Sequence, residues 1–292
     1  MPFPTRRGFL GAAGAAALAQ NRESIIDIHQ HTDYTGRSDD ALIAHQAKMG
    51  ITKTVLLPAG SRYGLEADAS GNDRCLQLVR RYPDKFTMFA NEVPYDDNFA
   101  EVIEKYLKLG AIGIGEQKFF VDVMGPVMDK IATVAQANGV PVLLHFQHER
   151  YNVNYGQFYK VLAKYPRVNF IGHAQTFWAN VDSKQEQDVL YPKWKVTAGG
   201  WTDRFLSDYP NMFADLSAGS GLNSMTRDLD QAREFVKRHV DKLIYGSDCN
   251  DSLGAGPKCS GSQQIAMMRK LAPDVAALRK IFEGNAKKVM KV

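Results

Sequence analysis

The chain has 292 residues, of which 45% are hydrophobic and 23% are charged, and its formal net charge is +4. This composition excludes an intrinsically disordered protein, and without a dense Lys or Arg block it gives no electrostatic case for a nucleic-acid partner or a membrane surface. The length suits one or two domains, or a single α/β barrel of about 250 residues.

The first 19 residues differ from the rest of the chain. A basic pair, Arg6-Arg7, precedes an apolar run over residues 9–19 that ends in the sequence ALA. A charged start, an apolar run and a small-residue cleavage pattern are typical of a signal peptide, and the run is too short to span a membrane. The basic pair followed by Phe-Leu resembles a twin-arginine export signal. We predict a signal peptide over 1–19 and export to the periplasm; the alternative is a disordered Ala/Gly tail.

From residue 24 onward, apolar runs alternate with amphipathic segments. The predicted strands are 24–31, 52–58, 85–94, 111–118, 141–147, 168–175, 211–220 and 242–250. The predicted helices are 38–50, 72–83, 98–110, 126–139, 156–166, 202–210, 229–241, 262–272 and 274–290. Continuous apolar strands indicate a parallel sheet covered on both faces.

Eight such units without a Gly-rich dinucleotide fingerprint favour a closed (β/α)8 TIM barrel over a doubly wound open sheet. We expect one domain over 20–292, with no membrane span after removal of the signal. Residues 176–200, an insert after the sixth strand, are expected to cap the active face.

Polar side chains end five of the predicted strands, where a barrel carries its active site. These residues are His29, His31, Glu116, His145, His173 and Asp248. Four of the seven histidines of the chain are among them. Such clustering is not expected of structural histidines scattered through a core.

This set suits a divalent metal ion. Residues two apart on a strand point to the same side, so His29 and His31 can bind one ion. Imidazole nitrogens and carboxylate oxygens are ligands of zinc, and a bound ion lowers the pKa of water to about 7. We expect His145 and Asp248 to complete the site. Asp248 can also take the proton of the water, and His173 can polarise the substrate or carry a proton.

The ordered set resembles the amidohydrolase superfamily, and within it the amidohydrolase-2 family of metal-dependent hydrolases and decarboxylases. The motifs IIDIHQH, NFIGHAQ, IYGSDC and IFEGNAKKV match family habits over residues 24–292. The resemblance implies a (β/α)8 barrel with the metal ligands His29, His31, His145 and Asp248, and with His173 beside the reacting group. Zn²⁺ is the expected ion, with Mn²⁺ as an alternative.

Glu116 decides the number of ions. In some relatives, including TatD-like deoxyribonucleases, a glutamate at this strand end bridges two metals and both later histidines bind the second. Many amidohydrolase-2 members hold one metal, so we expect one ion rather than two. The structural alternative for Glu116 is a salt bridge to Lys118 or to an arginine near the barrel mouth.

Other residues have weaker assignments. His148 and Arg150 could bind a substrate carboxylate, as alternatives to an ordinary polar loop, and Trp178 could line the substrate pocket, although packing is the commoner use of Trp. His45 lies on a predicted helix and is expected at the surface. Cys249 and Cys259 could form a disulfide across a Gly-rich loop or remain free thiols.

The predicted function is hydrolysis of a small-molecule ester, lactone or amide by metal-activated water. The first alternative is metal-dependent decarboxylation of an aromatic or muconate-like carboxylate. A non-catalytic binding protein that kept the barrel is a further alternative, against which the complete ligand set argues. The partner is expected to be a small-molecule substrate, and the sequence is compatible with a homo-oligomer.

Overall fold

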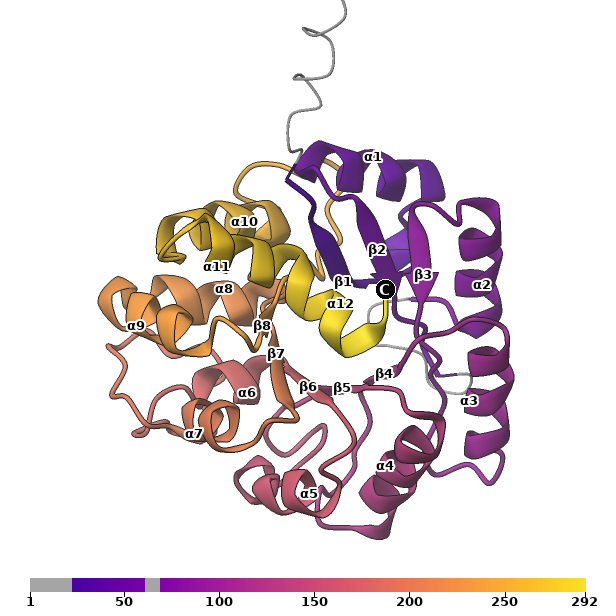
Figure 1. Ribbon diagram of the computed structural model, residues 1–292, viewed down its shortest axis with the longest axis horizontal. Helices are drawn as coiled ribbons and strands as arrows, with labels where there is room; N and C mark the ends of the chain where they lie inside the picture. Colours follow the sequence, from indigo (N-terminus) through magenta and orange to yellow (C-terminus); the bar gives the residue numbers. More distant parts are fainter. Residues whose placement is uncertain (1–22, 61–68) are drawn as a thin grey trace, which may run out of the picture.

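The computed structural model describes residues 23–60 and 69–292. The predicted signal peptide over 1–19 lies outside the described residues. Eight parallel strands form the centre of the fold (Figure 1). They are β1 (Ile26–Gln30), β2 (Lys53–Leu56), β3 (Phe86–Met88), β4 (Ile114–Gln117), β5 (Val142–His145), β6 (Phe170–His173), β7 (Met212–Asp215) and β8 (Leu243–Ile244).

The strands form two parallel ladders, β1-β2-β3 and β4-β5-β6-β7-β8. Backbone hydrogen bonds join the two ladders at both edges. Between β3 and β4, Ile112 N donates to Met88 O at 2.9 Å, and between β8 and β1, Ile28 N donates to Tyr245 O at 3.2 Å. No strand edge is left open between these elements, so the predicted (β/α)8 barrel is confirmed.

Helices surround the barrel, as Figure 1 shows. They are α1 (Asp39–Met49), α2 (Asn72–Arg81), α3 (Phe99–Lys108), α4 (Pro126–Asn138), α5 (Tyr159–Lys164), α6 (Gln175–Ala179), α7 (Trp201–Asp208), α8 (Ala218–Thr226), α9 (Leu229–His239), α10 (Ser260–Leu271), α11 (Val275–Arg279) and α12 (Asn285–Met290). Short 3-10 turns lie at η2 (Tyr34–Gly36) and η3 (Tyr155–Gln157), and a π-helical turn, η4 (Lys280–Gly284), links α11 to α12. Helices α6 and α8 were not predicted, because each begins inside the run that was assigned to the preceding strand, 168–175 and 211–220.

Apolar side chains fill the barrel interior. Almost every strand or its end contributes to this cluster, whose members include Ile26, Ile28, Val55, Phe89, Leu143, Ile171, Phe213 and Ile244. Ala286, Val289 and Met290 of α12 belong to the same cluster, and Figure 1 shows α12 lying across the centre of the ring. Helix α12 therefore closes the end of the barrel at which the strands begin, so that the opposite end carries the polar site.

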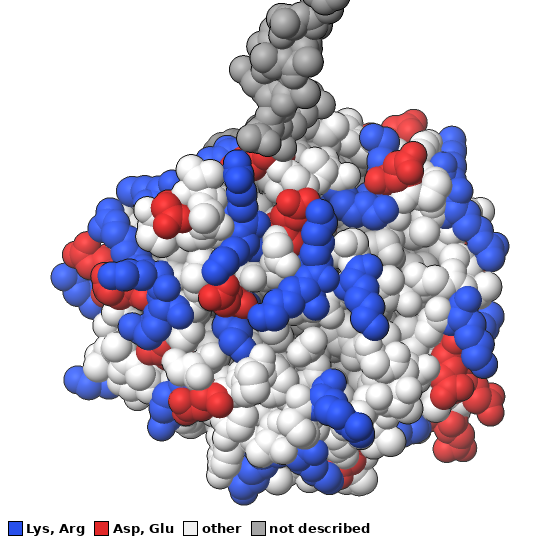
Figure 2. All heavy atoms as spheres, viewed as in Figure 1, with Lys and Arg blue, Asp and Glu red and all other residues white. Residues whose placement is uncertain are grey.

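The face that α12 covers is rich in basic side chains. Figure 2 shows Lys and Arg gathered around the middle of this face, with fewer Asp and Glu between them. Because α12 plugs the barrel here, these charges lie away from the strand ends at which the histidines gather. Across the described residues, we find no helix whose length and apolar character would let it cross a membrane.

Candidate metal centre

The six polar side chains predicted at strand ends converge at one mouth of the barrel. His29 of β1 and His31, which directly follows β1, bring their Nε2 atoms within 3.2 Å of each other. Asp248, which follows β8, places Oδ1 3.5 Å from His31 Nε2 and 3.7 Å from His29 Nε2. The histidine side chains are almost fully buried, while that of Asp248 is 12% exposed. These three residues form a first donor group, of which Asp248 lies nearest the opening.

Glu116 lies between this group and a second one. Its Oε2 is 3.7 Å from both His29 Nε2 and His31 Nε2. Its Oε1 is 2.5 Å from His145 Nδ1 and 3.7 Å from His173 Nε2. The two carboxylate oxygens thus face two different sets of imidazoles. The alternative of a salt bridge to Lys118 is not seen, since Lys118 Nζ lies over the ring of Tyr151.

The rear nitrogens of three histidines are fixed by hydrogen-bond acceptors. His31 Nδ1 donates to Leu57 O at 2.8 Å, and His29 Nδ1 donates to Asp215 Oδ2 at 2.7 Å. Ser217 Oγ donates to the same Asp215 oxygen at 2.8 Å and so accepts from His173 Nδ1 at 2.9 Å. Partners of this kind fix the tautomer and orientation of imidazoles that bind metals.

Asp215 and Ser217 were missed from the sequence. Asp215 is fully buried at the end of β7, but it lies in the middle of the predicted strand 211–220, so the selection of strand ends passed over it. A side chain at position 246 would exclude this arrangement, because a Cβ on Gly246 would lie 2.3 Å from Asp215 Oδ1. Tyr34 was missed as well; its hydroxyl donates to Asp248 Oδ1 at 3.0 Å and orients that carboxylate.

The electrostatics of the cluster favour negative carboxylates and a neutral His173. Burial alone would raise the pKa of Glu116, but the charges and hydrogen bonds of His145 and His29 together outweigh burial and lower the pKa well below its usual range. Burial is likewise outweighed at Asp248, whose pKa is lowered by His29 and His31. For His173, burial and the nearby His29 together lower the pKa to about 4. Burial opposes a charge on His29, but Asp248 and Asp215 raise its pKa well above the usual value.

These donors fit a divalent cation. With Nδ1 of His29 and His31 donating to acceptors, the two Nε2 atoms face each other across 3.2 Å, a position in which they can share either a proton or a metal ion. Ligands bound at about 2.0–2.2 Å to one ion lie roughly 3.0–3.6 Å from one another. The spacings among His29, His31, Asp248 and Glu116 are close to that range. Nitrogen and carboxylate donors suit zinc or manganese.

Of the residues predicted to bind substrate, His148 lines a cavity and Arg150 lies at the surface. His148 is half-buried and lines a cavity of about 200 Å³, together with Thr176, Gln187 and Trp201. Arg150 is exposed, with its guanidinium over the ring of Tyr151. The cavity is lined by residues that follow β5 and β6, including Thr176 and Gln187 of the 176–200 segment; that this segment caps the active face stays a prediction.

Trp178 and His45 do not lie where the sequence suggested. Trp178 is 1% exposed and its indole nitrogen donates to Asp215 O at 2.8 Å, so it packs and positions β7 rather than lining a pocket. His45 was expected at the surface, and this prediction is wrong: its side chain is buried. It shares the inner face of α1 with Leu42 and Met49, three and four residues away, a helical spacing that could have revealed the burial.

Comparison with known proteins identifies the family and supports the fold. A family profile described as Amidohydrolase matches residues 26–292. None of the curated proteins matches the chain.

Solved structures with the same fold include three that align along nearly their whole length. A probable 2-pyrone-4,6-dicarboxylic acid hydrolase from Acinetobacter baumannii is 17% identical, with a TM-score of 0.63, over 92% of this chain and 99% of its own. An uncharacterized TIM-barrel protein from Bordetella bronchiseptica is 17% identical, with a TM-score of 0.65, over 92% and 98%. A 2,6-dihydroxybenzoate decarboxylase from Rhizobium is 13% identical, with a TM-score of 0.57, over 92% and 99%. At these identities the likeness concerns the fold.

Proposed function

This chain belongs to the amidohydrolase family and is a metal-dependent enzyme, and from that premise we propose that it hydrolyses an ester, lactone or amide of a small molecule. The observation that carries the proposal is the position of Glu116, whose two oxygens face two separate donor groups. This position favours two ions over the single ion expected from the sequence. His29, His31 and Asp248 would hold one ion, His145 and His173 the other, and Glu116 would bridge them.

A bound divalent ion would supply a Lewis acid and a water of lowered pKa. The protein's own groups then have separate tasks. Asp248 is the carboxylate nearest the opening, and it would accept the proton of the attacking water while Tyr34 holds its orientation. His173 donates from Nδ1 to Ser217 Oγ and holds Nε2 3.7 Å from Glu116 Oε1, so we propose a nitrogen ligand in place of the proton carrier expected from the sequence. Asp215 and Ser217 keep the imidazoles turned toward the ions.

The cavity beside the mouth supports a small-molecule substrate. Its wall combines an aromatic side chain, Trp201, with the polar side chains of His148, Thr176 and Gln187. A mixed wall of this kind is typical of ligand sites, in which a few polar groups fix orientation. Its volume of about 200 Å³ suits a compact substrate rather than a polymer. We propose that His148, with Arg150 near the rim, contacts a substrate carboxylate.

The test combines activity with metal counting. The purified chain, loaded with zinc or manganese, is screened against lactones, aryl esters, small amides and aromatic carboxylates. Glu116→Gln removes one ligand oxygen and the bridging charge, so we expect it to lose about one ion per chain and at least ~100-fold in kcat/KM. Glu234→Gln, the same change on the outside of α9, serves as the matched control and should lose neither.

Two outcomes would contradict the proposal. If Glu116→Gln keeps the full metal content and activity, the glutamate does not bridge ions. If the loaded enzyme hydrolyses none of the panel but releases carbon dioxide from an aromatic carboxylate, the site catalyses decarboxylation instead.

We also propose that the chain is exported, on the strength of residues 1–19 alone. Expression of the full chain in a bacterium with a working twin-arginine pathway should give periplasmic protein that begins near residue 20. Replacing Arg6 and Arg7 by Lys should keep the protein in the cytoplasm. Retention of an intact N-terminus in the wild-type chain would contradict the proposal.

A further inference from the structure

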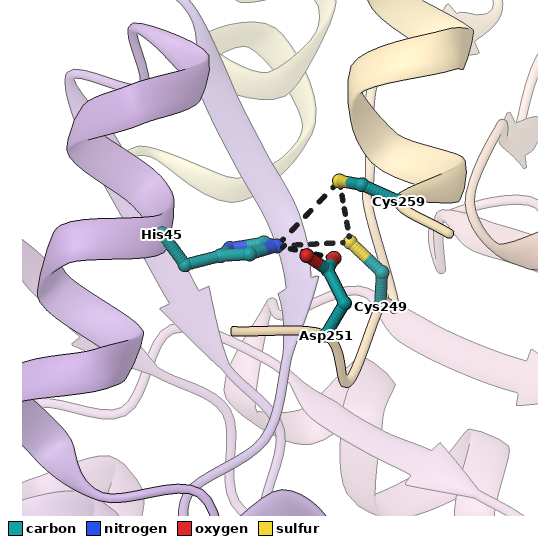
Figure 3. Close-up of side chains that lie close together, drawn as sticks. All are labelled: His45, Cys249, Asp251 and Cys259. Carbon is teal, nitrogen blue, oxygen red and sulfur yellow. Dashed lines mark hydrogen bonds and ion pairs between the residues drawn. The ribbon is translucent and has the colours of Figure 1, made fainter. Parts of the chain in front are cut away.

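A second group of metal-binding side chains lies outside the barrel mouth. His45 comes from α1, Cys249 and Asp251 from the loop after β8, and Cys259 from the residue that caps α10. Figure 3 shows all four side chains pointing at one another from these three elements. The proposed function uses none of the four.

The four donor atoms all lie within 4.8 Å of one another, and four of their six spacings can be compared with those of a tetrahedral site. His45 Nε2 lies 3.0 Å from Asp251 Oδ2, 3.2 Å from Cys249 Sγ and 3.6 Å from Cys259 Sγ. The two sulfur atoms are 3.4 Å apart. Around a zinc ion with bonds of about 2.0–2.3 Å, tetrahedral ligands lie roughly 3.3–3.8 Å from one another. The observed spacings are close to this range and need only a small expansion.

The contacts of His45 argue against a catalytic triad. In a nucleophile–histidine–carboxylate relay, the nucleophile and the carboxylate bind opposite nitrogens of the imidazole. Here Asp251 and both sulfurs meet the same nitrogen, Nε2, while Nδ1 contacts Gln46 Oε1 at 3.2 Å. Three partners around one nitrogen suit a common central ion and do not suit proton relay.

A disulfide accounts for less of the arrangement than an ion does. Cys249 and Cys259 are free thiols, and a disulfide would use only these two of the four side chains. It would leave the convergence of His45 and Asp251 on the same point without a reason. An ion engages all four side chains. Two thiolates and one carboxylate carry three negative charges, so a site with a divalent cation has a net charge of about −1.

The surroundings supply the matching positive charge and a rigid frame. Arg37 is 7% exposed, and its Nη1 donates to Cys249 O and Asp251 O, each at 2.9 Å. Ser262 N, in the first turn of α10, donates to Cys259 Sγ at 3.3 Å, a contact that favours a thiolate. The loop lies directly on α1, since a Cβ on Gly254 would be 2.4 Å from His45 O.

We propose that His45, Cys249, Asp251 and Cys259 form a structural zinc site. Each thiol that binds the ion releases its proton to solvent. The site fastens the loop after β8 to α1, and Cys249 directly follows Asp248 in the chain. The ion therefore holds in place the loop from which Asp248 reaches the barrel mouth. The protein supplies all four ligands, so no coordination position is left for water or substrate. This is typical of structural zinc sites.

Cobalt substitution tests the proposal on the full purified chain, because the barrel mouth contains no sulfur donor among its described residues. Thiolate bound to Co²⁺ gives a charge-transfer absorption in the near ultraviolet that nitrogen and oxygen ligands do not give. We expect this band in the reduced wild-type protein. It should disappear in Cys249→Ser and Cys259→Ser, with loss of about one zinc per chain. Cys75→Ser, a buried cysteine on α2, is the matched control and should keep both.

The wild-type protein alone also decides the matter if the variants fail to fold. X-ray absorption at the zinc edge should show sulfur neighbours at about 2.3 Å. Glu116→Gln, which changes only the barrel mouth, should leave the cobalt–sulfur band unchanged. The proposal is overturned if the reduced wild-type chain gives neither the band nor the sulfur neighbours. It is also overturned if mass spectrometry of the unreduced chain finds Cys249 joined to Cys259.

Discussion

The contact between Asp215 and His29 leads to a prediction about metal affinity. Asp215 Oδ2 accepts from His29 Nδ1 at 2.7 Å and from Ser217 Oγ at 2.8 Å, while Oδ1 accepts from Ser217 N at 3.0 Å. Asp215→Asn keeps the shape of the side chain but replaces one of these acceptor oxygens by an NH2 donor. One of the buried donors of His29 or Ser217 then loses its acceptor, or His29 changes its tautomer.

The size of the effect follows from these contacts. Loss of a hydrogen bond behind a metal-binding histidine typically costs 10–100-fold in metal affinity. At about 1.4 kcal/mol per tenfold change, the predicted loss is roughly 1.4–2.7 kcal/mol. A buried donor without an acceptor costs a further ~1–3 kcal/mol of folding stability in the metal-free protein.

Competition with a chromophoric chelator measures the affinity, and urea unfolding of the metal-free protein measures the stability. Asp203→Asn is the matched control. Asp203 is also a buried aspartate bonded to a histidine, at 2.6 Å from His239 Nε2, but it lies away from the barrel mouth. We expect the control to lose stability and to keep its metal affinity.

The reasoning is refuted if Asp215→Asn binds zinc within about twofold of the wild type. It is also refuted if the control loses as much affinity as Asp215→Asn, because the loss would then reflect general destabilisation.

Three further predictions concern the site and the fold. Tyr34→Phe removes the donor to Asp248 Oδ1, so turnover should fall about tenfold while the metal content measured by elemental analysis stays unchanged. Burial opposes ionisation of Asp203, but the hydrogen bond from His239 and the charge of Arg238 lower its pKa. Its stabilisation is then present above the unfolded pKa of about 3.9 and is lost as pH falls through the folded value. The gap in urea midpoints between wild type and Asp203→Asn should therefore begin to narrow below about pH 4 and should close only below the folded pKa; a constant gap would contradict this. Met290→Ala, in the helix that plugs the barrel, should lower the free energy of unfolding by about 2–5 kcal/mol, and a loss below 1 kcal/mol would show that α12 does not seal the core.

Much of the fold could be predicted because the strand signals are local. Continuous apolar runs separated by capped helices predict parallel strands, as at α1, where Ser38 caps the start and Gly50, with φ of 79°, ends the helix. The short helices α6 and α8 could not be predicted, because tertiary burial overrides their weak helical pattern. Strand β8 covers only Leu243–Ile244, well short of the predicted run 242–250.

The strand-end residues could also be selected from the sequence, because parallel strands of a barrel all end at the same side. What remained open was the role of Glu116, since sequence order does not say which side chains its two oxygens face. The residues behind the imidazoles, Asp215 and Ser217, are nearly 200 positions from His29, and no local pattern connects them.

The sequence by itself determined the barrel, the end that carries the site and the chemical type of its ligands. These follow from periodicity along the chain and from the common direction of the strands. Only the tertiary structure decided which donors share a centre. Barrel closure sets Glu116 between two imidazole groups, and the packing of the β8 loop on α1 brings Cys249 to His45, 204 residues earlier. Distances between such remote side chains depend on how strands close and loops pack, which local sequence does not encode.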